Sequence, residues 1–208
     1  MDFQTNKILG GVGALLILIG CLSSVSPGIG LLGLIGFILV LIALNGFANY
    51  YNEKGIFSNA LYGIIIFIVG FVITIAVAIF ILVDFLTSLG IDITNWQSFQ
   101  YVDWANIMTP DKILHLVGSG IIALVILFIF SILGAYFIKK SFDLLATKTG
   151  VKLFGTTGLI LLIGAVLTII LIGFILILVA IILLIISFFS INTPASTPEP
   201  QKPPVQTS

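Results

Sequence analysis

The sequence has 208 residues, of which 60% are apolar and 8% are charged, and its mean hydropathy is +1.31. A soluble domain carries about 25% charged residues, so this composition excludes a soluble fold. The formal net charge is zero and every basic residue is a lysine, which argues against a nucleic-acid partner. One cysteine and one histidine exclude an internal disulfide framework and a Cys/His metal cluster.

Apolar runs predict six helices, at about residues 8–22, 30–48, 59–83, 110–137, 153–168 and 173–190. About 20 apolar residues suffice to cross the ~30 Å hydrocarbon core of a bilayer. Proline and glycine mark the first turn, and Tyr50 and Tyr51 mark a polar loop at the membrane interface. We therefore interpret residues 1–191 as an all-α, polytopic membrane domain made of three hairpins.

The segment from residue 85 to residue 112 has a different composition, with aspartates and large aromatic side chains. Its characteristic residues, with the aspartate that precedes it, are Asp84, Asp92, Trp96, Phe99, Tyr101, Asp103, Trp104 and Asp111. Such a segment is expected to lie at the membrane surface, with its rings at headgroup depth. Thr109, Pro110 and Asp111 then provide a cap, a first-turn proline and a first-turn acid for the next helix.

The apolar run at residues 158–190 has two interpretations. As one helix it would be ~50 Å long, beyond the hydrocarbon thickness, and the protein would then have five helices. As two helices it forms a hairpin with an apolar turn near residues 169–173. Residues 192–208 are rich in proline, threonine and glutamine and are expected to form a disordered tail.

An internal repeat favours the six-helix interpretation. Residues 34–44 (LIGFILVLIAL) recur at residues 171–181 (LIGFILILVAI) with eight of eleven positions identical. Gly173 should therefore occupy the position of Gly36, in the second helix of a hairpin. A weaker echo places a glycine and a hydroxyl four residues apart in the first, third and fifth helices, for helix packing. The pairs are Gly20 with Ser24, Gly70 with Thr74, and Gly164 with Thr168.

The lysines indicate an orientation. With six helices and a cytoplasmic N-terminus, seven lysines are inside (Lys7, Lys54, Lys139, Lys140, Lys148, Lys152 and Lys202) and only Lys112 is outside. This predicts a multi-pass cell-membrane protein whose C-terminus is also cytoplasmic. The five-helix alternative would put the tail outside.

The interiors of the predicted helices contain no Asp, Glu, Lys or Arg, and His115 is the one exception to weigh as a functional group in the membrane. We therefore predict no enzyme activity and name no catalytic, cofactor-binding or metal-binding residue. His115 lies one helical turn after Asp111, so the two side chains can meet on one face of the helix. They could form a pH-sensitive or ligand-contacting pair, or His115 could be a structural histidine at the membrane interface. We favour the structural role. Asn45 could join helices by a hydrogen bond.

The polar connector that begins at Lys139 and ends at Lys152 has two explanations. It could bind anionic lipid, at about 1 kcal/mol per lysine near the surface. Its lysines could also act only to set the orientation of the protein in the membrane, and we favour this explanation. Cys21 is interpreted as a small apolar residue of the first helix.

Residues 3–11 (FQTNKILGG), residues 33–48 and the loop at residues 50–57 (YYNEKGIF) resemble the uncharacterised archaeal membrane family called domain of unknown function 996. The resemblance covers about residues 1–191 and implies an archaeal cell-membrane protein. Some members carry a C-terminal zinc ribbon, but this chain has no cysteine pair, so no metal is implied. The family supplies no activity.

The sequence is therefore compatible with two kinds of function. The first is a non-enzymatic structural or interaction role, in which the helices pack with a second copy or a partner membrane protein. The alternative is a small channel or carrier for a neutral or apolar solute, because many transporters are built from internal repeats. A polar cavity at the interface of the repeats would favour the alternative.

Overall fold

The structure is a computed structural model that describes residues 2–22, 27–91, 94–95 and 109–192. Its helices are α1 (Phe3–Leu22), α2 (Pro27–Tyr50), α3 (Lys54–Ser88), α5 (Pro110–Thr149), α6 (Leu153–Leu167) and α7 (Ile172–Phe189), with a 3-10 turn η2 (Thr168–Ile170) before α7. The described part of the chain has no strand. Six of its helical segments are long and apolar enough to span a membrane, so the all-α, six-helix prediction is confirmed and the five-helix alternative is wrong.

Several predicted features lie outside the described residues. These are the serine-rich part of the first turn, the proline-rich tail from residue 193 onward, and the central acidic and aromatic residues of the 85–112 segment (Asp92, Trp96, Phe99, Tyr101, Asp103 and Trp104).

The predicted break in the last apolar run is present. Leu171 adopts the left-handed conformation, with φ of 64°, which a non-glycine residue adopts only where the surrounding structure holds it. Its N–H donates a hydrogen bond to the carbonyl of Thr168 at 3.0 Å. Because an unpaired backbone group is costly in hydrocarbon, this bond helps an otherwise apolar turn to exist in a membrane.

The first four helices, α1, α2, α3 and α5, are longer than their predicted apolar runs. The largest difference is in α5, which was predicted to end at residue 137 but continues to Thr149. Leucine, alanine and lysine favour helix, and Lys139 pairs with Asp143 one turn later, so the predicted connector continues the helix. Gly150, with φ of 74°, ends it in the way that glycine ends many helices.

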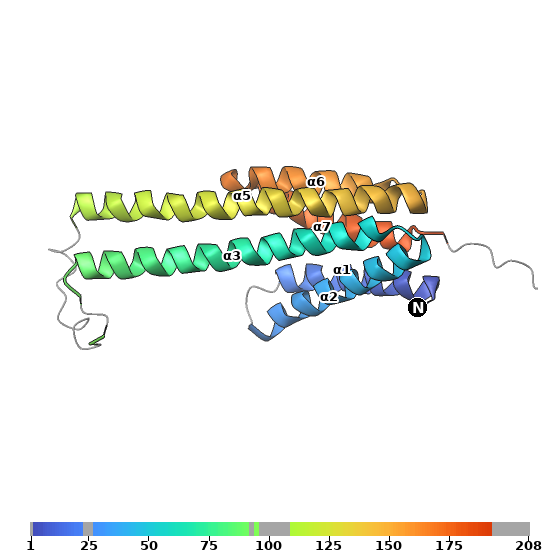
Figure 1. The fold of residues 1–208 in the computed structure, drawn as a ribbon, viewed down its shortest axis with the longest axis horizontal. Helices are drawn as coiled ribbons and strands as arrows, with labels where there is room; N and C mark the ends of the chain where they lie inside the picture. Colours follow the sequence, from blue (N-terminus) through green and yellow to red (C-terminus); the bar gives the residue numbers. More distant parts are fainter. Residues whose placement is uncertain (1, 23–26, 92–93, 96–108, 193–208) are drawn as a thin grey trace, which may run out of the picture.

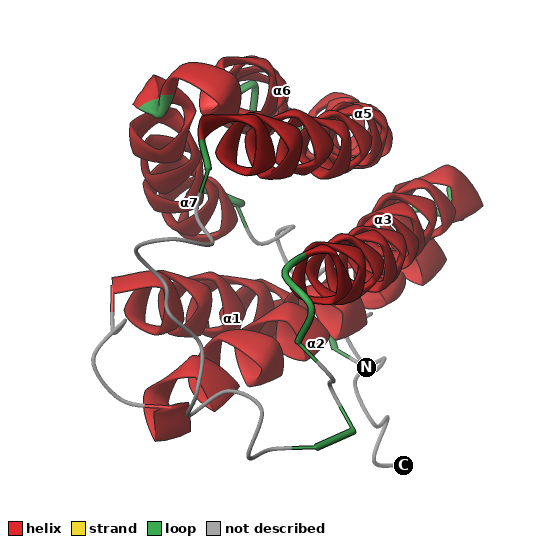
Figure 2. Ribbon diagram, turned by 90° about the vertical axis from the view of Figure 1, so that its left-hand side faces the viewer, coloured by secondary structure: helices red, strands yellow, loops and turns green. Residues whose placement is uncertain are grey.

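The six helices form a closed ring in which neighbours in the sequence are neighbours in space (Figure 2). α1 pairs with α2, α3 with α5 and α6 with α7, and the contact between α1 and α7 closes the ring. Lys7 of α1 fastens this closure, because its ammonium group donates a hydrogen bond to the carbonyl of Ile191 at 2.7 Å.

The two central helices are much longer than the outer hairpins (Figure 1). At 1.5 Å per residue, α3 is about 52 Å long and α5 about 60 Å long. α1, α2, α6 and α7 pack along only one half of this pair, beside the ends that carry Lys54 and Lys148. We call this the lysine end, and we call the other end, which carries Asp84 and Asp111, the aspartate end.

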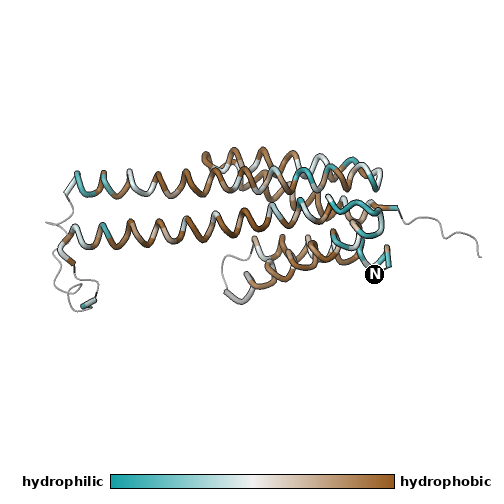
Figure 3. Tube along the Cα trace, viewed as in Figure 1, coloured by the Kyte–Doolittle hydropathy of each residue, from teal (hydrophilic) through white to brown (hydrophobic). Residues whose placement is uncertain are grey.

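The core lies at the lysine end, where six helices meet. Its largest fully buried side chains include Phe47, Phe154 and Phe188, each 0% exposed. Phe188 is the centre of this group, with ring centroids 5.1 Å from Phe154 and 6.3 Å from Phe47. Apolar residues cover most of the length of the helices, while polar residues gather at the two ends (Figure 3), as expected for a chain solvated by lipid.

Candidate functional site

Each hairpin is held by a reciprocal contact between two glycines. If a Cβ atom were added to either glycine of a pair, it would lie within 3.2 Å of the other glycine's carbonyl oxygen. The pairs are Gly13 with Gly36, Gly63 with Gly134, and Gly164 with Gly173. Glycine permits this approach because lipid gives apolar side chains no drive to associate, and close backbone packing supplies the attraction instead. These contacts bring the backbones of the two helices together in each hairpin.

The two copies of the repeat are equivalent in the structure. Residues 34–44 and 171–181 have the same class of burial in ten of eleven positions. Each copy lies in the second helix of its hairpin, except that Leu171 is the turn residue before α7. Gly36 and Gly173 both contact a glycine of the preceding helix. The predicted equivalence of Gly173 and Gly36 is thus confirmed.

The glycine–hydroxyl spacing has a local function. The hydroxyl of Thr74 donates to the carbonyl of Gly70, and that of Thr168 donates to the carbonyl of Gly164, each at 2.8 Å. Each hydroxyl is therefore satisfied within its own helix, while the glycine contacts a neighbouring helix. The spacing combines a close approach with a self-satisfied polar group.

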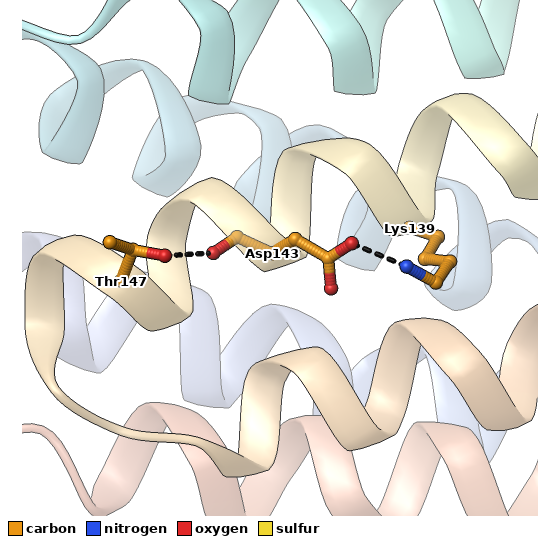
Figure 4. A network of polar contacts seen from close by, with 3 residues as sticks. All are labelled: Lys139, Asp143 and Thr147. Carbon is orange, nitrogen blue, oxygen red and sulfur yellow. Dashed lines mark hydrogen bonds and ion pairs between the residues drawn. The ribbon is translucent and has the colours of Figure 1, made fainter.

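Polar contacts fasten the lysine end. In α5, Lys139 pairs with Asp143, whose carbonyl accepts a hydrogen bond from Thr147 (Figure 4). Lys148 pairs with Glu53 at 3.2 Å and so joins α5 to the loop between α2 and α3. Exposed pairs of this kind contribute about 0–1 kcal/mol each, so they orient the elements more than they stabilise them.

One buried hydroxyl joins the two long helices. Ser141 of α5 is 0% exposed and donates a hydrogen bond to the carbonyl of Ile56 in α3. A second polar contact, at 3.4 Å between the hydroxyls of Thr157 and Ser187, joins α6 to α7. Both contacts escaped the sequence analysis, because serine and threonine in an apolar run give no sign of which helix they face.

The predicted pair of His115 and Asp111 lies on exposed turns at the aspartate end. Within the described residues no hydrogen bond or ion pair joins the two side chains. They line a cavity of about 320 Å³ with Lys112 and with Asp84 and Ser88 of α3. The described residues contain no group of three or more His, Cys, Asp or Glu side chains that could hold a metal ion.

A second cavity, of about 290 Å³, lies beside α2 near the lysine end. Its lining residues are Ile42, Asn45, Gly46, Asn49 and Tyr50. Asn45 is exposed here, and in the described part of the chain it has no partner in a neighbouring helix, so it does not join helices of one molecule as predicted. In the adjoining loop, burial and the neighbouring Tyr50 raise the pKa of the Tyr51 phenol.

Cys21 is a free cysteine at the exposed end of α1. Its position agrees with a small residue of the first helix, as predicted.

These features define a polytopic helical membrane protein built from three glycine-packed hairpins. The family model described as a protein of unknown function, DUF996, matches residues 32–182, and the chain belongs to this family. It is also similar to the uncharacterized protein MJ1644 of Methanocaldococcus jannaschii, with 34% identity over 191 residues, which cover 92% of this chain and 94% of that protein. No solved structure matches the chain.

Proposed function

We propose that this protein is a non-enzymatic membrane component that self-associates through the outward side of α5. The surface in question, here called the Gly118 face, consists of Leu114, Gly118, Ile121, Ile122 and Val125. These residues are exposed, Leu114 by 71% and Ile122 by 59%. They lie in the half of α5 that only α3 accompanies.

Gly118 is the observation that carries the proposal. The glycines of the three hairpin contacts each meet another helix, whereas a Cβ atom added to Gly118 would meet nothing within 4 Å. In lipid, an exposed apolar side chain gains little by leaving the acyl chains, but a glycine allows two helices to approach closely. Gly118 is thus suited to a contact with another molecule.

A second copy of the chain is the partner that fits best. A two-fold symmetric pair would bring Gly118 against the same glycine of the second copy. This would reproduce between molecules the glycine–glycine contact that already joins the helices of each hairpin.

The test compares two substitutions that add bulk to exposed positions of the long helices. Gly118→Ile should lower the dimerisation constant by about 5- to 30-fold, because it removes a close contact worth roughly 1–2 kcal/mol. Ala76→Ile, on the exposed side of α3, should leave it unchanged. Energy transfer between labelled copies in liposomes measures the dimer fraction. A monomeric wild type, or equal dimerisation of both variants, would contradict self-association.

The orientation belongs to the same proposal, with both termini in the cytoplasm. It is supported by the lysines, since Lys7, Lys54, Lys148 and Lys152 gather at one end of the bundle. A single cysteine at Thr147, introduced with Cys21→Ser, should react with a membrane-impermeant maleimide only after intact cells are opened. Labelling of Thr147→Cys in intact cells would mean that the protein has the opposite orientation, with this end of the bundle outside the cell. A cysteine at exposed Thr109 is the matched control, which should react in intact cells.

Anionic lipid at the connector remains a proposal. Among the described residues, Lys140 and Lys152 are exposed without an ion pair, whereas Lys139 and Lys148 pair with Asp143 and Glu53. Two unpaired lysines would contribute about 2 kcal/mol at an anionic surface.

The carrier alternative is less well supported by the packing. The centre of the ring at the lysine end is filled by Phe47, Phe154 and Phe188, so a solute following the ring axis would have to displace these rings. The interface between the two outer hairpins is also closed, because Phe188 of α7 lies against Gly10 of α1.

A further inference from the structure

The cavity beside α2 has an unusual lining for a membrane protein. Its polar side chains are the amides of Asn45 and Asn49 and the phenol of Tyr50. Each is a neutral group that can both donate and accept hydrogen bonds. Its volume of about 290 Å³ is at the lower limit for sites that hold small molecules. We call this cavity the Gly46 notch.

A buried amide lies directly behind the notch. Asn6 of α1 is 1% exposed, and in the described structure neither atom of its amide has a hydrogen-bond partner. A Cβ atom on Gly46 would lie 2.1 Å from Oδ1 of Asn6 and 2.4 Å from its Nδ2. The amide therefore occupies the space that a side chain at position 46 would fill. An unpaired buried amide costs about 1–3 kcal/mol, so Asn6 is not explained by stability.

The depth of the notch indicates what can reach it. Tyr50 ends α2, and Lys54 begins α3 four residues later, so the notch opens where the helices leave the apolar zone. Tyrosine at this level is typical of the headgroup region. Asn45 and Asn49 point outward from the ring and are exposed. At this depth, lipid headgroups and the water among them are the surrounding groups that can satisfy them.

We propose that the Gly46 notch binds a lipid through its uncharged, hydroxyl-bearing headgroup. This headgroup would be a sugar or another polyol. Amides and a phenol match hydroxyls, because each side can donate and accept. The lining residues include no carboxylate for a cationic headgroup and no lysine for a phosphate. Glycine at position 46 leaves room for the Asn6 amide, which lies behind the lining of the notch. This inference does not depend on self-association through the Gly118 face.

The experiment uses the full chain in nanodiscs of phosphatidylcholine that contain a minor fraction of a diglycosyl diacylglycerol. Native mass spectrometry of the released protein measures the fraction that retains the glycolipid. The double substitution Asn45→Leu with Asn49→Leu should lower retention by about tenfold or more, since two hydrogen bonds of about 0.6–2 kcal/mol are lost. Asn192→Leu, at another exposed asparagine, should leave retention unchanged.

Three results would overturn the proposal. The first is equal glycolipid retention by wild type and the double variant, with both proteins equally helical. The second is displacement of the glycolipid by the free disaccharide when both are present at the same concentration, which would indicate a site for a soluble sugar. The third is a loss of oligomers in the double variant while retention stays unchanged, which would make the notch a protein interface.

Discussion

Replacing Gly173 with alanine is expected to destabilise the protein by about 3 kcal/mol, the upper part of the range for overpacking. The added Cβ atom would lie 2.1 Å from the carbonyl oxygen of Gly164 and 2.2 Å from the backbone nitrogen of Thr168. Both atoms belong to the backbone, so no side-chain rotation relieves the clash, and α6 and α7 must separate. Unfolding in mixed micelles, followed by the loss of helical circular dichroism, measures the change.

Gly118→Ala is the matched control for Gly173→Ala. Its added Cβ atom meets open space, so the free energy of unfolding of the monomer should not fall, and the higher helix propensity of alanine should raise it by up to about 1 kcal/mol. Equal effects of the two substitutions would show that the Gly164–Gly173 contact does not hold the hairpin.

The second large effect is expected at Phe188. Phe188→Ala should cost about 3–5 kcal/mol, the usual loss for truncating a fully buried phenylalanine. The ring is 0% exposed and lies between Phe47 of α2, Phe154 of α6 and Gly10 of α1. Its loss leaves a cavity where the ring of helices closes, so α1 and α7 should separate first.

Phe174→Ala serves as the comparison, because Phe174 lies on the same helix with 55% of its surface exposed. Its truncation should cost less than about 0.5 kcal/mol. A double-cysteine distance measurement between α1 and α7 would show whether the closure opens. A Phe188→Ala variant as stable as Phe174→Ala would mean that the phenylalanine core does not fasten the ring.

The sequence predicts the class of fold because lipid imposes a simple rule of length and polarity. The same rule located the turn between α6 and α7, and the repeat placed Gly173 correctly in α7, the second helix of that hairpin. The rule failed for the ends of helices, since α5 continues through Lys139, Asp143 and Lys148. A lysine marks the edge of the hydrocarbon, not the end of a helix. Gly150 was the better signal for that end.

The candidate sites were harder to predict. Asn45 was correctly singled out as a polar group in a membrane helix, but its direction depends on which face α2 turns toward α1. Asn6 and Ser141 gave no signal, because their importance comes from contacts with Gly46 and with the carbonyl of Ile56, distant in the sequence. Residue type shows that a polar group needs a partner, and only the packing shows which partner it has.

The unequal helix lengths also bear on how the protein fits a bilayer. The outer helices match a hydrocarbon core of about 30 Å, whereas α3 and α5 continue well beyond them toward the aspartate end. A helix pair longer than the core that it crosses requires either a tilt of the pair or a local thickening of the bilayer around its aspartate end.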